Sequence, residues 1–74
     1  GICDISQKQG RLRFMLKEFD MEKVSELYAR KEYNGKLRIE AGSTPCVSLK
    51  ITNKARVIDE ARRFVADWAS FPKN

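Results

Sequence analysis

The stretch that decides the fold is NGKLRIEAGSTPCVSLKI, residues 34–51. In its first half apolar residues alternate with charged ones, and in its second half they alternate with cysteine, serine and lysine. Alternation at a period of two predicts two strands, each with one buried face. The loop 41–45 contains Gly42 and Pro45, so we expect the strands to form a hairpin. Its inward-facing residues are expected to be Leu37, Ile39, Val47, Leu49 and Ile51.

Another hairpin is predicted nearer the N-terminus. Residues 2–5 and 12–16 are rich in apolar side chains, and they flank a polar stretch whose Gly10 can adopt the positive φ of a turn. Side chains alternate between the two faces of a strand, so one face of 12–16 is apolar and is expected to point inward. The residues on that face are Leu12, Phe14 and Leu16.

Two amphipathic helices are predicted, one after each hairpin. Asp20 is a suitable N-cap for a helix over 21–33, and Gly35 offers a left-handed stop after it. Thr52 or Asn53 is expected to cap the second helix, and Pro72 to end it. The expected apolar stripes are Met21, Val24, Leu27 and Tyr28 in the first helix, and Val57, Ile58, Ala61, Phe64, Val65 and Trp68 in the second.

The predicted element order is therefore ββαββα. We expect an α+β fold of two layers, with one four-stranded, mainly antiparallel sheet and both helices on one of its faces. The chain of 74 residues is long enough for a single domain, over 1–74. It begins at Gly1 and enters a strand pattern almost at once, as expected of a domain excised from a larger protein.

The sheet face turned away from the helices is expected to be basic. The chain carries 15 basic and 10 acidic residues, a net charge of +5, and much of the excess falls on outward strand positions. Glu40 is the one acidic residue predicted there, and Cys46 is expected on the same face near Lys36 or Arg38. The candidate contact residues are Arg11, Arg13, Lys17, Lys36, Arg38 and Lys50.

Most catalytic chemistry lacks support in this sequence. There is no histidine, so nucleophile–histidine pairs and histidine metal ligands are excluded. Phosphate-loop, dinucleotide-binding and C-x-x-C motifs are also missing, and we expect no catalytic, cofactor or metal site. Cys3 and Cys46 are expected to be reduced thiols rather than a disulfide. Neither a membrane span nor a signal peptide is present, which favours a soluble, cytoplasmic domain.

Three uses of the basic face remain open. It can be a solvated surface, it can track the phosphates of a nucleic acid, or it can dock an acidic protein surface. The predicted aromatic residues lie on inward stripes or at element ends, so stacking of bases on the sheet is disfavoured. The alternative to protein docking is thus a small basic nucleic-acid-binding module.

The chain resembles the C-terminal domain of bacterial transcription-repair coupling factors, the Mfd family. The resemblance spans nearly the whole chain and is most specific at NGKLR followed by AGxxP, whereas only the amphipathic pattern agrees in the last helix. The stretches that carry it are residues 1–2, 19–20, 34–39, 41–45 and 47–51.

This resemblance implies a non-catalytic regulatory domain. Its parent would be an ATP-dependent DNA translocase that displaces stalled RNA polymerase and recruits UvrA for nucleotide excision repair. ATP, Mg²⁺ and DNA would bind other domains of that parent. The C-terminal domain would pack on the UvrB-like N-terminal module of the same chain and mask its UvrA-binding surface. The resemblance assigns none of these contacts to individual residues.

Overall fold

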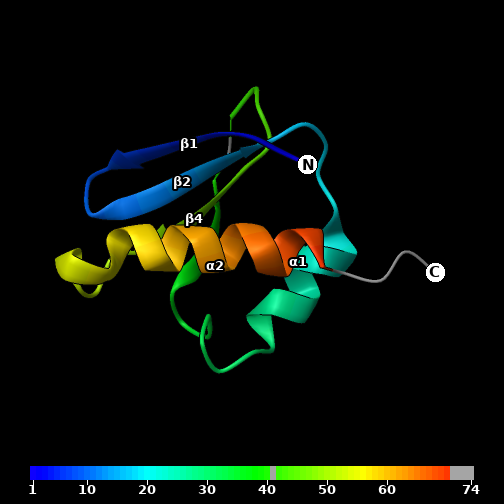
Figure 1. Ribbon diagram of the computed structural model, residues 1–74. Helices are drawn as coiled ribbons and strands as arrows, with labels where there is room; N and C mark the ends of the chain where they lie inside the picture. The colour runs from blue at the N-terminus through cyan, green and yellow to red at the C-terminus, as the bar shows by residue number, and fades with distance from the viewer. Residues whose placement is uncertain (41, 71–74) are drawn as a thin grey trace.

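A computed structural model describes residues 1–40 and 42–70, and it confirms the predicted α+β fold with the order ββαββα (Figure 1). Its elements are β1 (Ile2–Lys8), β2 (Arg11–Leu16), α1 (Met21–Tyr28), β3 (Leu37–Glu40), β4 (Cys46–Lys50), a 3₁₀ turn η1 (Lys54–Arg56) and α2 (Val57–Ala69). The predicted loop residue Ala41 and the predicted helix stop Pro72 lie outside the described residues.

The four strands form one sheet in the order β1-β2-β4-β3, and all neighbouring strands are antiparallel. Both predicted hairpins are present, as β1-β2 and β3-β4. The pairing of β2 with β4 joins the two hairpins, with Phe14 opposite Val47. As a result β2 and β4 are the central strands, and β1 and β3 are the edges.

The first hairpin has a longer first strand and a shorter loop than the sequence predicts. Lys8 pairs with Arg11 across a loop in which Gln9 and Gly10 have φ values of 53° and 74°. Two successive positive φ values are typical of the two-residue turns that match the twist of antiparallel strands. The prediction for Gly10 is confirmed. The polar residues 6–8, which look like loop in the sequence, therefore belong to β1.

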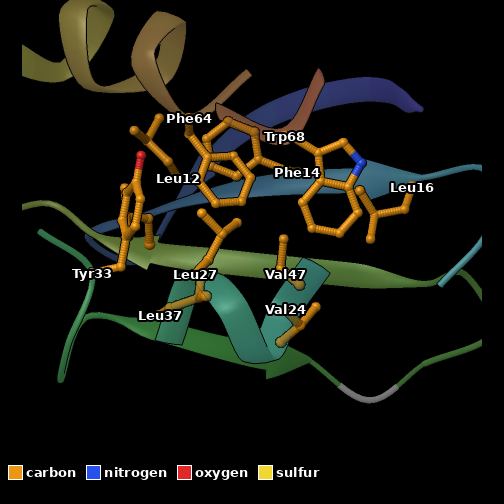
Figure 2. Close-up of a cluster of buried hydrophobic side chains, with 11 residues drawn as sticks. Leu12, Phe14, Leu16, Val24, Leu27, Tyr33, Leu37, Val47, Phe64 and Trp68 are labelled. Atoms are coloured by element: carbon orange, nitrogen blue, oxygen red, sulfur yellow. The ribbon is translucent and has the colours of Figure 1, made fainter. Parts of the chain in front are cut away.

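Both helices cover one face of the sheet and enclose a single apolar core. The inward residues of β2 meet α2, where the rings of Phe14 and Phe64 lie 4.3 Å apart. Phe64 also contacts Tyr33 and Trp68, at centroid distances of 5.6 and 6.0 Å. Figure 2 shows this cluster between the strands and the two helices. The fully enclosed side chains of α1 are Val24 and Leu27.

Helix α1 is shorter than predicted. It begins at the expected N-cap Asp20, whose carboxylate accepts from the backbone N–H groups of Glu22 and Lys23. It ends at Tyr28, and a series of turns replaces the predicted last helical residues. These turns bring Tyr33 into the core, where its hydroxyl donates to Asp67 of α2. Packing of the Tyr33 ring in the core therefore outweighs the helical propensity predicted for residues 29–33.

Several apolar residues assigned to the core are exposed. Ile39 lies opposite the buried Val47 and so shares its face, but it belongs to the edge strand β3 and is 40% exposed. Met21 and Tyr28 sit at the two ends of α1. Ile58, in the first turn of α2, is 67% exposed, and Asn53 caps the 3₁₀ turn η1 rather than α2, which begins at Val57. The predicted stripes are therefore too wide at the ends of the elements.

No helix in the described parts of the chain is both long and apolar enough to cross a membrane.

Candidate docking site on the basic sheet face

The register places the outer side chains of the sheet in rows. Residues directly opposite each other on antiparallel strands point to the same face. One row runs from Lys8 through Arg11 to Lys50, and the next runs from Ser6 through Arg13 and Ser48 to Arg38. A third row contains Asp4, Met15, Cys46 and Glu40. Basic residues therefore gather at the end of the sheet where β1 turns into β2.

A hollow of about 470 Å³ lies on this part of the face. It is lined by residues of β1, β2, β3 and the turn between β1 and β2, on both sides of the central strand β4. Four of the lining residues are basic and one is acidic, which leaves an excess of three positive charges. We call it the basic hollow, and its lining residues are Lys8, Gln9, Arg11, Arg13, Arg38, Ile39 and Glu40.

Arg11 is held in place by three hydrogen bonds. Its Nε donates to the Ser48 hydroxyl over 2.7 Å, and one terminal nitrogen donates to the carbonyl oxygens of Lys36 and Ser48 over 2.7 and 3.2 Å. These acceptors lie on β4 and just before β3, so the guanidinium bridges three adjacent strands. A charged donor with several fixed acceptors is well oriented before any partner arrives.

Glu40 reaches from β3 across β4 to the arginines of β2. One carboxylate oxygen lies 3.4 Å from Arg13 Nε, and the other lies 4.0 Å from Arg11 Nε. The Arg13 Nε is buried and has no hydrogen-bond partner among the described residues. The side chains that cross β4 also cover it, which explains why Ser48 is fully buried on a face that has no helix.

The pKa of the Glu40 carboxyl lies below its ordinary value. Hydrogen bonding with the Ser48 hydroxyl is the main cause, and the nearby Arg13, Arg11 and Arg38 add to it, while desolvation acts in the opposite direction. A hydroxyl can accept from one group and donate to another, so Ser48 can link Arg11 to Glu40. The hollow therefore contains a stabilised carboxylate among its arginines.

The structure brings together half of the six predicted contact residues. Arg11, Arg13 and Arg38 all line the basic hollow. Lys50 is exposed opposite Arg11 but lies outside that lining. Lys17 follows the far end of β2, where its N–H donates to the Gly1 carbonyl.

The prediction that Lys36 lies on the outer face of the sheet is wrong. Its ammonium lies 3.8 Å from a carboxylate oxygen of Glu60 on α2. Lys36 precedes β3, so the alternation of that strand does not fix its direction. A carboxylate at the start of α2 attracts it away from the outer face. Lys36 instead lines a separate hollow of about 550 Å³ with Tyr33 and Glu60.

The expectation for Cys46 also needs correction. It does lie on the outer face, but it is 2% exposed, and its neighbours in the register are Met15 and Glu40 rather than Lys36 or Arg38. Side chains from the neighbouring strands cover it because β4 is central. Both Cys46 and the exposed Cys3 are free thiols.

Sequence reasoning missed two parts of the hollow. Lys8 falls in the polar stretch between the first two predicted strands, but the two-residue turn places it on β1 beside Arg11. The period of two, continued from Asp4 through Ser6 to Lys8, was the available signal. The contact of Glu40 with the arginines across β4 could not be predicted from neighbouring residues. It depends on a strand order in which β2 and β3 lie on either side of β4, and that order is set by tertiary pairing.

Other features of the described residues favour structural roles. Burial, hydrogen bonding to Asp67 and the Asp67 charge raise the pKa of Tyr33 above its ordinary value, so its hydroxyl stays protonated. Arg30 pairs with the same carboxylate at 3.6 Å. No group of three or more cysteine, aspartate or glutamate side chains capable of holding a metal occurs within 1–40 and 42–70.

Comparisons of the chain with protein-family models, curated proteins and solved structures found no match.

Proposed function

We propose that this chain is a non-catalytic regulatory domain that docks through its basic sheet face onto an acidic protein surface. The observation that carries the proposal is the basic hollow, where Arg11, Arg13 and Arg38 meet on the one sheet face that the helices leave open. Arginine is suited to such contacts because its planar guanidinium pairs with carboxylates through two parallel hydrogen bonds.

The family resemblance supplies the partner in this proposal. As the C-terminal domain of a transcription-repair coupling factor, the chain would pack on the UvrB-like N-terminal module of its parent and keep UvrA out until the parent rearranges. The parent would translocate on double-stranded DNA in the cytoplasm, using ATP and Mg²⁺ bound elsewhere, and displace stalled RNA polymerase. A polar contact between domains of one chain can be broken and remade, as this regulation requires.

Catalysis is a weaker alternative for these residues. Clear pKa shifts occur, within the described part of the chain, at Tyr33 and Glu40. The first follows mainly from burial against α2, and the second mainly from hydrogen bonding with Ser48, with the nearby arginines adding to it. Tyr33 contacts the Asp67 carboxylate and Glu40 contacts the Ser48 hydroxyl, but these contacts pack α2 and order the arginines, which favours a structural role for both pairs.

The alternative with specific support is a nucleic-acid-binding module, because the excess charge of the basic hollow would also attract phosphates. The hollow lacks one feature of single-strand readers, since no aromatic side chain lines it among the described residues. Protein docking is therefore the better-supported proposal.

The test compares two charge reversals in the full-length parent protein. Lys8→Glu with Arg38→Glu changes two exposed residues at the rim of the hollow. Lys31→Glu with Lys54→Glu changes the net charge equally but at exposed positions outside it. We expect the rim variant to bind UvrA more tightly than the unmodified parent, and the control to bind it equally. Equal UvrA affinity of both variants and the unmodified parent would refute docking through this face.

A further inference from the structure

The basic hollow already holds one carboxylate, and that carboxylate is poorly placed. Glu40 reaches it from β3, across β4, and its nearer oxygen stops 3.4 Å from Arg13 Nε. Charge-assisted hydrogen bonds between nitrogen and a carboxylate are usually about 2.7–2.9 Å long. Within residues 1–40 and 42–70 the buried Arg13 Nε has no hydrogen-bond partner, so the intramolecular pair leaves a donor unsatisfied.

A carboxylate from another chain faces no such restriction. It approaches from solvent, and its position is not set by a strand on the far side of β4. Arg11 is already fixed by Ser48 and the Lys36 carbonyl, so an incoming group has a rigid donor to bind. Arg38 and Lys8 are exposed at the rim of the hollow and add positive charge. Among the described residues, neither forms an ion pair with Glu40 at 4.0 Å or less.

We propose that Glu40 is a built-in competitor in the basic hollow, and that a glutamate or aspartate of an acidic peptide segment displaces it from Arg13 and Arg11. This inference rests on the proposed function, because it takes the same sheet face as the docking surface. It adds the chemistry of the partner and a residue that weakens the contact. The bound state has the partner carboxylate between the two arginines and Glu40 turned out to solvent.

An acidic peptide is favoured over a nucleic acid on two observations. The group that the arginines hold in the structure is itself a carboxylate. The described lining of the hollow also offers no aromatic ring for a base. Competition by Glu40 has a regulatory consequence, since it keeps the affinity low enough for the contact to open.

The test titrates a blocked hexaglutamate peptide into the 74-residue chain at low ionic strength and follows the arginine Nε–H resonances by NMR. Glu40→Gln removes the competitor. Glu60→Gln is the matched control, because it changes the net charge equally at the ion pair with Lys36, outside the hollow. Displacing Glu40 breaks an ion pair whose atoms lie about 4 Å apart, and avoiding that cost is worth about a fivefold gain in affinity in water.

We expect Glu40→Gln to bind the peptide about fivefold more tightly than the unmodified chain. Glu60→Gln should bind it with nearly the same affinity as the unmodified chain. The Arg13 Nε–H resonance should shift when the peptide binds. Equal gains for the two variants would overturn competition by Glu40. The proposed function would still stand in that case, provided that Arg13→Gln weakens binding by the unmodified chain. No effect of Arg13→Gln would refute both.

Two further measurements keep the result interpretable. The urea midpoint of each variant reports whether it is folded, and Glu40→Asp provides a second variant that keeps the charge but shortens the reach by one methylene. We expect Glu40→Asp also to bind the peptide more tightly than the unmodified chain; a weaker affinity would count against displacement. A single-stranded oligothymidine that binds more tightly than the peptide would overturn the choice of an acidic peptide.

Discussion

Replacing Ser48 by alanine is expected to destabilise the domain, although the residue lies on the sheet face without helices. Ser48 is fully buried, and its hydroxyl accepts from Arg11 Nε over 2.7 Å. In Ser48→Ala that nitrogen loses its partner, and the Glu40 carboxylate, 4.0 Å away, is too distant to replace the hydrogen bond. The Arg11 side chain is only 16% exposed, so water replaces the lost partner poorly.

The expected loss follows from the value of a hydrogen bond to a charged group, about 1.5–3 kcal/mol. A domain of 74 residues has a typical free energy of unfolding of about 4–11 kcal/mol, so the loss is a large fraction of it. With a urea m value of about 1.5 kcal/mol per M, the midpoint falls by about 1–2 M. The fluorescence of Trp68, the single tryptophan and 4% exposed, reports the transition.

The control is Ser25→Ala, which removes an exposed hydroxyl from α1. We expect it to change the free energy of unfolding by about 0.5 kcal/mol or less. In an Arg11→Met background, Ser48→Ala should cost less than it does alone, because the donor is gone. If Ser48→Ala in the unmodified chain is as mild as Ser25→Ala, the two carbonyl contacts suffice to hold Arg11, and the reasoning is wrong.

Three further predictions concern stability. Phe64→Ala removes the fully buried ring at the centre of the core and should cost about 3–5 kcal/mol, whereas Ile58→Ala, at a residue 67% exposed, should cost about 0.5 kcal/mol or less in the same urea titration. Because the pKa of Tyr33 is higher in the folded protein, its hydroxyl loses its proton at a lower pH in the unfolded chain than in the folded one. The free energy of unfolding should therefore fall as the pH rises above 10.0. Tyr33→Phe should reduce that fall in alkaline denaturation curves. The lowered pKa of the Glu40 carboxyl has the opposite effect, because its contribution to stability is present above its unfolded value of 4.5 and is lost as the pH falls through the folded value. Glu40→Gln should therefore weaken the fall of the urea midpoint at acid pH. An unchanged fall would contradict the stabilisation of the Glu40 carboxylate by Ser48 and the arginines.

The sequence predicts the fold well because its periods are clear within each element. Leu12, Phe14 and Leu16 are all buried as their alternation indicates, and Asp20 caps α1 as its position suggests. Failures occur where elements end. The helix predicted over 21–33 includes Tyr33, but in the structure the chain turns after Tyr28 and the Tyr33 ring packs on Phe64 of α2. That contact is between residues distant in sequence, so the local pattern does not predict it.

The candidate site is predicted less completely. The alternation within β2 and β3 correctly places Arg11, Arg13 and Arg38 on the outer face. The grouping of these residues depends on β4 lying between β2 and β3, and the sequence does not fix that strand order. The same order explains the burial of Cys46 and Ser48, because long side chains from two neighbouring strands can cover a central strand.

The central place of β4 has a consequence for synthesis of the protein. Of the four strands β4 is translated last, yet it is the partner of both β2 and β3. Before residue 46 leaves the ribosome, β3 has no neighbour and β1-β2 is an isolated hairpin, which is marginally stable in water. The four-stranded sheet can therefore be completed only after β4 is available, and topologies built from contacts distant in sequence fold more slowly than those built from local contacts.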